Sequence, residues 1–250
     1  MDEHIDLESV FESSDAREWT LHTHEYVMTD SGRSKGLNVL TPPDYDTSDQ
    51  YPVLYLLNEM GTDHDAWLSQ GKVEAALANL LAAGRIQPMI AVLADGHALP
   101  VTEEGFLTKV WDPFEREMLA DIIPLVRKHY SISDDRFMHA IAGTSLGACH
   151  SVRIGLRQRD QFAWIGAFSG GAFEPESDFA EVATDATVNE QMKLVQIQCV
   201  EEDFVVIFAV QDLHDWLEAK GIRHEYLIDD GEHDWQTWRR YFINFITKLF

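Results

Sequence analysis

Residues 140–147 read Ala140-Ile141-Ala142-Gly143-Thr144-Ser145-Leu146-Gly147, and this stretch decides the fold. The apolar residues before Gly143 are typical of the end of a buried strand, and a helix is favoured over residues 146–158. A G-x-S-x-G pattern alone is a weak signal, but here a strand precedes it and a helix follows. The combination predicts a nucleophile elbow, in which glycines leave room for a strained serine and expose its hydroxyl above a sheet.

Strands and helices alternate through the rest of the chain. Continuous apolar runs bounded by turn residues predict strands buried on both faces of a parallel sheet at residues 52–57 and 89–93. Further strands are predicted at residues 137–142, 163–168, 194–199 and 225–228. Residues 19–28 and 37–40 look like antiparallel or edge strands. Helices are predicted over residues 72–83, 112–129, 146–158, 206–220 and 235–249. The sequence therefore predicts the α/β class, with a mostly parallel doubly wound sheet and antiparallel N-terminal strands.

The predicted domain organisation is simple. Residues 1–18 form an acidic N-terminal segment, and residues 19–250 are expected to make a single α/β domain, because this part contains no linker, repeat or low-complexity tract. Residues 174–189 are acidic and lack a clear periodicity, so we expect an excursion over the sheet edge. Cys149 and Cys199 lie outside any C-x-x-C pair and are interpreted as core residues.

The charge balance limits the partners. A formal net charge of −24 repels phosphate backbones and anionic lipid, and no basic patch interrupts the acidic composition. We therefore expect a small-molecule substrate, no nucleic acid and no membrane partner, and homo-oligomer formation is left open. The first residues carry no apolar signal region and no run is long enough to cross a bilayer, so a cytoplasmic location is expected.

A serine hydroxyl needs a base, and the base needs a third group to fix its tautomer. In this architecture the chain order is serine, then acid, then histidine. His233 is the candidate base, because it lies in a loop between the last predicted strand and the final helix. Asp203 is the preferred acid and Glu202 the alternative, since both follow a strand at the carboxyl edge of the sheet. The candidate catalytic residues are therefore Ser145, Asp203 and His233.

The chain resembles the putative esterase family. This family includes carbohydrate esterase family 1 feruloyl and acetylxylan esterases, tributyrin esterases and S-formylglutathione hydrolases of the esterase D type. The resemblance covers about residue 26 to the C-terminus and rests on residues 51–57, 140–147, 168–171, 202–204 and 231–235. It implies the α/β-hydrolase fold, Ser145 as nucleophile, Asp203 as acid and His233 as base, and it implies neither a metal nor an organic cofactor.

The chain departs from the family after its first buried strand. There it reads Asn58-Glu59-Met60-Gly61, where the family has His-Gly-x-Gly. By position, the N–H groups of Met60 and Leu146 are expected to form the oxyanion hole. If the position of Glu59 needs a positive φ, a glutamate is strained there by about 1–3 kcal/mol. Its charge would also oppose an oxyanion. Glu59→Gly is therefore expected to raise kcat by about tenfold.

These observations lead to three candidate functions. The first is a serine carboxylic ester hydrolase that forms an acyl-enzyme from short acyl or aryl esters of the feruloyl or acetyl type. Glu59 and Trp235 are candidate pocket residues. Trp67, Trp111 and Trp235 could each stack on a sugar or phenolic group, but each by itself is interpreted as core or rim rather than a ligand contact. The second is a catalytically weakened or inactive binding protein with the same fold. An acyltransferase that uses the same triad is a third reading.

Overall fold

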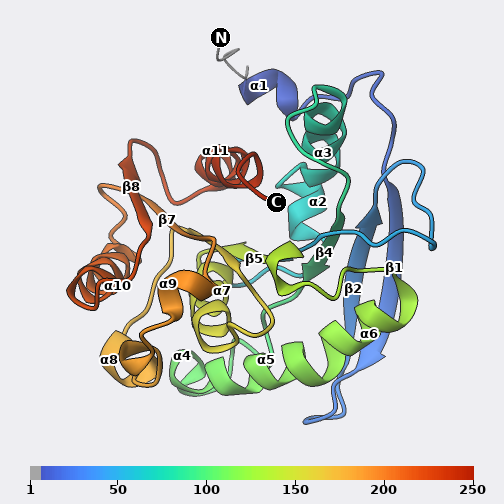
Figure 1. Ribbon diagram of the computed structural model, residues 1–250. Helices are drawn as coiled ribbons and strands as arrows, with labels where there is room; N and C mark the ends of the chain where they lie inside the picture. Colours follow the sequence, from blue (N-terminus) through green and yellow to red (C-terminus); the bar gives the residue numbers. More distant parts are fainter. Residues whose placement is uncertain (1–6) are drawn as a thin grey trace.

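The computed structural model describes residues 7–250, which are built around one sheet of eight strands (Figure 1). The strands are β1 (Thr20–Val27), β2 (Ser34–Thr41), β3 (Val53–Leu57), β4 (Ile90–Ala94), β5 (His139–Thr144), β6 (Trp164–Phe168), β7 (Leu194–Val200) and β8 (Glu225–Asp229). They lie in the order β1-β2-β4-β3-β5-β6-β7-β8. The pairs β1–β2 and β2–β4 are antiparallel and every later pair is parallel, which confirms the predicted fold class.

Helices connect the parallel strands. The longer ones are α3 (Val73–Ala82), α5 (Trp111–Glu117), α6 (Ile123–His129), α7 (Leu146–Arg157), α10 (Ile207–Ala219) and α11 (Trp235–Ile246). The short ones are α1 (Leu7–Val10), α2 (Ala66–Ser69), α4 (Phe106–Lys109), α8 (Pro175–Asp178), α9 (Val188–Gln191), and the turns η1 (Met118–Ile122), η2 (Arg136–Met138) and η3 (Val182–Thr184). The predicted long helices are present, whereas α2 and α4 were not predicted because one helical turn has too few residues to show a period.

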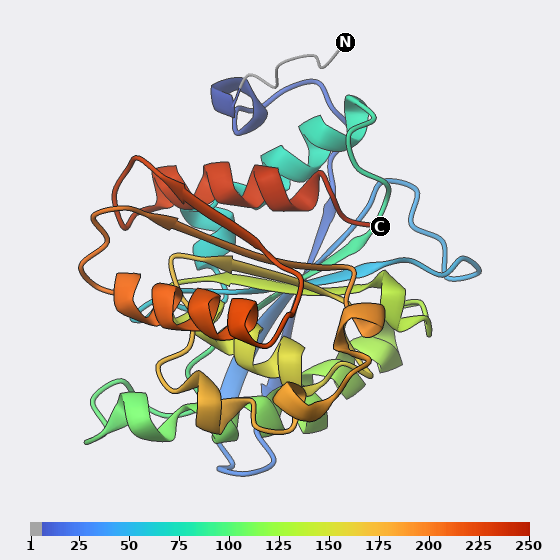
Figure 2. The same cartoon turned by 60° about the vertical axis from the view of Figure 1, so that its left-hand side comes forward.

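The sheet lies between two helical layers (Figure 2). Helices α3 and α11 cover one face, where Leu77 and Phe242 belong to the same buried cluster as Leu54 of β3. Helices α5, α6, α7 and α10 cover the other face, where Phe114 and Val152 pack with other buried apolar side chains. The central strands β3, β4 and β5 are buried at every position, as the continuous apolar runs of β3 and β4 predicted for those two strands. Two apolar layers hold the carboxyl ends of the parallel strands in fixed positions.

The helix predicted over residues 112–129 contains a π turn. Helix α5 runs into η1, a five-residue π segment, and α6 continues with Pro124 in its first turn. A proline has no N–H and its ring clashes with the preceding turn of an α-helix, so a wider turn before Pro124 lets the helix continue. The expected helix is therefore present, with a local change in its winding that the apolar spacing does not reveal.

The ends of the chain and the acidic excursion lie over the outside of this core. Of the acidic segment at residues 1–18, residues 1–6 lie outside the described residues, and the remainder begins with α1 against α3 (Figure 1). The Asn79 side chain of α3 donates to the carbonyls of Val10 and Glu12. Residues 174–189 form α8, η3 and the start of α9 outside the sheet. Within residues 7–250 no helix is both long and apolar enough to cross a bilayer.

Candidate active site

Ser145 lies at the tight turn between β5 and α7. Its backbone has φ 51° and ψ −112°, a conformation that L-residues rarely adopt. The flanking glycines are required by space, because a Cβ on Gly147 would lie 2.5 Å from the carbonyl oxygen of Leu57. A Cβ on Gly143 would lie 2.6 Å from the carbonyl carbon of Gly147. The Ser145 N–H donates to the carbonyl of Phe168 at 2.9 Å, which ties the strained turn to β6.

Ser145, His233 and Asp203 form one hydrogen-bonded chain. The His233 ring places Nε2 3.0 Å from Ser145 Oγ and Nδ1 2.8 Å from Asp203 Oδ2. The three residues follow β5, β7 and β8, whose carboxyl ends meet at one edge of the sheet. Glu202, the alternative acid, is exposed, whereas Asp203 is 2% exposed. The structure thus brings together the three residues preferred from the sequence.

The surroundings of Asp203 keep it ionised. Burial acts to raise the pKa of Asp203, but the hydrogen bond and charge of His233 and the N–H groups of Val205 and Val206 outweigh burial, so the pKa lies below its ordinary value. Cys199, at 3.7 Å, directs its thiol at Asp203 Oδ2. An ionised acid accepts from Nδ1–H of His233 and leaves the Nε2 lone pair facing Ser145.

His233 is held by the start of α11. The Asp234 side chain caps this helix by accepting from the N–H of Thr237 at 2.9 Å, and Thr237 Oγ1 accepts from the N–H of Glu232. The Trp238 ring meets the His233 ring edge-on, with centroids 5.0 Å apart. The cap and the aromatic contact fix the direction of the imidazole.

We call residues 58–61, Asn58-Glu59-Met60-Gly61, the oxyanion loop. The Asn58 side chain is buried and donates to the Glu59 carbonyl at 3.1 Å and to Thr62 Oγ1 at 3.0 Å. Glu59 Oε1 accepts from the indole N–H of Trp235 at 3.0 Å, so the oxyanion loop is tied to the segment that carries the candidate base. Within residues 7–250, the backbone N–H groups of Met60 and Leu146 donate to no backbone acceptor.

The expectation of backbone strain at Glu59 is wrong. The residues other than glycine with positive φ within the described chain are Asp44, Lys72, Ser145, Ser169 and Phe250, and Glu59 is not among them. The left-handed position of the oxyanion loop is instead Gly61, with φ 90°. The loop therefore keeps the second glycine of the family pattern at the position where the backbone needs one, and Glu59 replaces a glycine at a position that does not need a positive φ.

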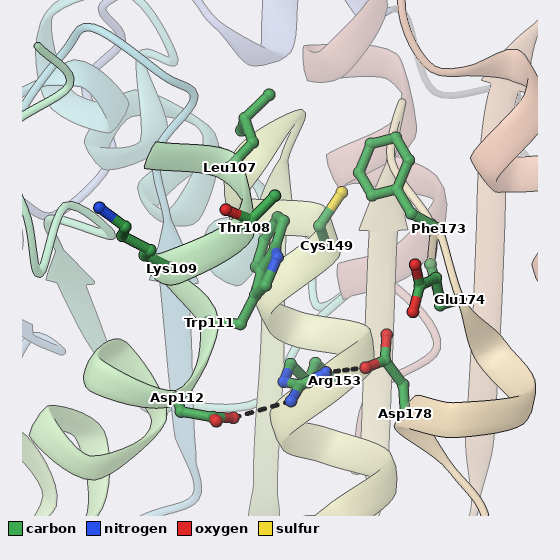
Figure 3. Close-up of a pocket in the computed structure, with 12 residues that line it drawn as sticks. Leu107, Thr108, Lys109, Trp111, Asp112, Cys149, Arg153, Phe173, Glu174 and Asp178 are labelled. Carbon is green, nitrogen blue, oxygen red and sulfur yellow. Dashed lines mark hydrogen bonds and ion pairs between the residues drawn. The ribbon is translucent and has the colours of Figure 1, made fainter. Parts of the chain in front are cut away.

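A cavity of about 480 Å³ is shown in Figure 3, and its wall includes Cys149 of α7, which lies one helical turn after Ser145 in the chain. Leu107, Trp111 and Phe173 give its upper part apolar side chains, beside Thr108 and Lys109, and the rings of Trp111 and Phe173 lie 6.3 Å apart. Figure 3 shows Arg153 at the bottom, where it ion-pairs with a carboxylate on each side. The cavity can take a flat apolar group with polar atoms at its far end.

Several of these residues were missed by the sequence analysis. Leu107, Phe173 and Arg153 come from α4, the segment after β6 and α7, and no local pattern connects them. Of the tryptophans, Trp67 is 1% exposed and belongs to the core, as interpreted. Trp111 is half-buried and lines the cavity of Figure 3, and whether it contacts a ligand stays a prediction.

Comparison with known proteins places the chain in a family. The sequence profile of the family described as "Putative esterase" matches residues 29–249. The chain belongs to the putative esterase family. Its fold is the α/β-hydrolase fold of this family's solved members, and the eight-stranded sheet described above agrees with it.

Two of the proteins similar to this chain are named as feruloyl or ferulic acid esterases. An endo-1,4-beta-xylanase/feruloyl esterase of Xylanibacter ruminicola is 28% identical over 226 residues, which cover 88% of this chain and 30% of the relative. A carbohydrate esterase family 1 ferulic acid esterase of Anaeromyces mucronatus, solved in complex with ferulic acid, is 26% identical with a TM-score of 0.86, over 97% of this chain and 95% of that one. The chain thus spans about a third of the length of the curated relatives it matches.

Proposed function

We propose that this esterase-family protein is a serine carboxylic ester hydrolase that acts through an acyl-enzyme. The observation that carries the proposal is the hydrogen-bonded chain from Ser145 through His233 to the buried Asp203. A nucleophile, a base of the correct tautomer and an orienting acid are the groups that acyl transfer requires. The carbonyl carbon of the ester is the atom that Ser145 Oγ attacks.

In the first half-reaction Ser145 Oγ bonds to the ester carbon while its proton passes to His233 Nε2. The carbonyl electron pair moves onto oxygen, and the N–H groups of Met60 and Leu146 donate to this oxyanion. His233 then gives its proton to the departing alcohol, and the acyl group stays on Ser145. In the second half-reaction water repeats the attack with His233 as base, which releases the acid and restores the serine hydroxyl.

For the substrate we propose short acyl or aryl esters, with an aryl acyl group in the cavity of Figure 3. The apolar walls at Leu107, Trp111 and Phe173 suit a planar ring, and the charged floor suits ring hydroxyl groups. The ferulic acid named with the Anaeromyces structure is the free acid of such an aryl acyl group. Phe173→Ala is expected to raise KM for methyl ferulate more than KM for p-nitrophenyl acetate.

Hydrolysis of p-nitrophenyl acetate and methyl ferulate by the purified chain tests the proposal. Ser145→Ala is expected to lower kcat by at least about 10³-fold, because no nucleophile remains. Ser48→Ala removes the hydroxyl of an exposed serine and is expected to leave kcat unchanged. Absence of turnover by the wild-type chain on both esters, or turnover that survives Ser145→Ala, contradicts the proposal. The backbone strain at Glu59, one of the two arguments for a weakened binding protein, is absent, and the negative charge of Glu59 near the oxyanion is the argument that remains for that alternative.

A further inference from the structure

Two hydrogen bonds join the oxyanion loop to the segment that follows β4. The N–H of Gly61 donates to Nε2 of His97 at 3.1 Å, and the N–H of Gly96 donates to Oδ1 of Asn58 at 2.9 Å. The strands β3 and β4 are parallel neighbours, so these two segments leave the sheet side by side. The oxyanion loop is therefore attached to a second loop at both of its ends.

Asp95 sets the orientation of the His97 ring. Since Nε2 accepts from Gly61, it carries no proton, and the ring proton is on Nδ1, which donates to Asp95 Oδ1. The same carboxylate oxygen accepts from the backbone N–H of His97 at 2.9 Å. His97 is 6% exposed, and its ring stacks on Phe106 with centroids 6.0 Å apart. Tautomer and ring direction are thus both fixed.

A buried lysine, Lys35, holds Asp95 in place. Lys35 of β2 is 7% exposed, and its ammonium donates to the Asp95 carbonyl at 2.6 Å and to Glu117 Oε1 at 2.7 Å. Burial acts to raise the pKa of Asp95, but the hydrogen bond from His97 and the charge of Lys35 outweigh it and lower the pKa. An ionised Asp95 holds His97 in the Nδ1–H tautomer at neutral pH. Through Lys35 and Glu117, the segment that carries Asp95 and His97 is hydrogen-bonded to β2 and α5.

This arrangement determines which N–H of the oxyanion loop can face a substrate. The N–H of Gly61 is occupied by His97, whereas the N–H of Met60 has no backbone acceptor among residues 7–250. Rotation of the Gly61 peptide would break the contact with His97 and would also turn the neighbouring Met60 peptide. The position of the Met60 N–H therefore depends on the contact made one residue later.

We propose that His97, oriented by Asp95, is a positioning residue that holds the Gly61 peptide so that the Met60 N–H stabilises the oxyanion. This inference rests on the proposed function. His97 does not touch the substrate and acts through the backbone of the oxyanion loop. An oxyanion donor acts more strongly in the transition state than in the ground state, so loss of its alignment lowers kcat and leaves KM nearly unchanged.

Two substitutions of His97 by amides distinguish the hydrogen bond to Gly61 from the packing of the His97 ring. In His97→Gln the amide reaches the place of Nε2 and can accept from Gly61, whereas in His97→Asn the amide reaches only the place of Nδ1 and leaves Gly61 without an acceptor. With p-nitrophenyl acetate we expect His97→Asn and His97→Ala to lower kcat by about 10- to 100-fold, below the 10²–10³-fold loss of a complete oxyanion donor. His97→Gln is expected to stay within about fivefold of wild type, and KM within about twofold throughout.

Binding of a trifluoromethyl ketone, whose adduct with Ser145 carries the oxyanion, supplies the second measurement. Its Ki is expected to rise in His97→Asn by the same factor by which kcat falls, because both report the same donor. The control is His24→Ala, which removes a part-buried histidine whose ring contacts Tyr130 and His129, and it is expected to change neither value. If His97→Gln is no more active than His97→Ala, or if His97→Asn is as active as His97→Gln, the proposal is overturned. A fall in kcat without a rise in Ki also overturns it.

A measurement that needs no turnover keeps this inference separate from the proposed function. In nitrogen NMR of the wild-type chain, His97 Nε2 is expected to show the signal of an unprotonated ring nitrogen, and the Gly61 amide is expected to exchange slowly with solvent. In His97→Asn the Gly61 amide is expected to exchange at least about tenfold faster. If the wild-type chain hydrolyses no ester but these signals appear, the proposed function fails while the attachment stands. A protonated Nε2, or an equally fast Gly61 exchange in both chains, overturns the attachment itself.

Discussion

Asp203→Asn is the substitution whose effect follows most directly from the contacts of the site. The wild-type carboxylate accepts from His233 Nδ1 at 2.8 Å through Oδ2 and from the Val205 N–H at 3.2 Å through Oδ1. Both of its oxygens thus face donors. An asparagine offers one oxygen and one NH₂ group, so one of these donors must face another donor in either orientation of the amide.

Both orientations are poor for catalysis. With the amide oxygen toward His233, the tautomer is correct but the negative charge is lost and the NH₂ group opposes the N–H of Val205. With the NH₂ group toward His233, Nδ1 becomes the acceptor and the proton moves to Nε2, where it faces Ser145 and cannot take its proton. We therefore expect kcat to fall by about 10³- to 10⁴-fold, which corresponds to roughly 4–5.5 kcal/mol of lost transition-state stabilisation.

The assay is kcat and KM for p-nitrophenyl acetate, with thermal unfolding measured to show that the variant is folded. Glu202→Gln is the matched control, because it removes the same charge from an exposed neighbour on the same loop. It is expected to remain within about twofold of wild type, since charges exposed to water are strongly screened. A folded Asp203→Asn within tenfold of wild type, or a larger loss in Glu202→Gln, would refute the assignment of the acid.

Three further outcomes are expected. Glu59→Gln keeps an acceptor for the Trp235 indole and removes a negative charge, so kcat should rise about fivefold, the effect of roughly 1 kcal/mol. Glu59→Gly also loses the contact with Trp235, so the tenfold gain expected from the sequence is replaced by no gain, and a Glu59→Gly variant faster than wild type would contradict a role of this contact. Burial lowers the pKa of His150 to about 3, so the unfolded chain binds a proton below about pH 6.5 that the folded chain does not. The free energy of unfolding therefore decreases as the pH falls from 6.5 toward 3. Between pH 7 and pH 4, urea unfolding should show a decrease about 3 kcal/mol smaller in His150→Leu than in the wild type, and equal decreases in the two chains would contradict this. Gly147→Ala places a Cβ 2.5 Å from the Leu57 carbonyl oxygen and should lower the unfolding free energy by about 1–3 kcal/mol, and an unchanged urea midpoint would show that the elbow tolerates a side chain.

The triad could be predicted because each of its residues carries a local signal. Gly143 and Gly147 mark a turn with no room for side chains, and Asp203 and His233 each follow a strand whose apolar run is visible in the sequence. In a parallel sheet the carboxyl ends of strands lie at one edge, so the elements bring these residues together without any knowledge of side-chain contacts. Ser145 then lies within reach of the base.

The oxyanion loop could be predicted only in outline. Its position after β3 follows from the sequence, but the backbone angles of Glu59 do not, and the glycine of the left-handed position is Gly61. The partner of Gly61 is His97, which is 36 positions away and reads in the sequence as part of an ordinary turn. Contacts between loops depend on the register of β3 against β4, which the composition of either loop does not encode.

The cavity was not predicted for a similar reason. Its floor is made by Arg153 between Asp112 and Asp178, which come from three helices, and its apolar wall includes Phe173 from an irregular segment. In the sequence an acidic residue in this chain is most simply interpreted as solvated surface, because acidic residues are so numerous. Only the packing of α4, α5 and α8 around α7 turns these charges toward one another.

Labelling with a fluorophosphonate tests the central claim most directly, because the reagent bonds to a serine only where a base and oxyanion donors activate it. Peptide mapping of the labelled wild-type chain is expected to find the added mass on the peptide that contains Ser145 and on no other. Ser145→Ala is expected to remain unlabelled, while the Ser48→Ala control labels as the wild type does. Labelling that persists in Ser145→Ala, or a wild-type chain that reacts no faster than its denatured form, would contradict the assignment of Ser145 as an activated nucleophile.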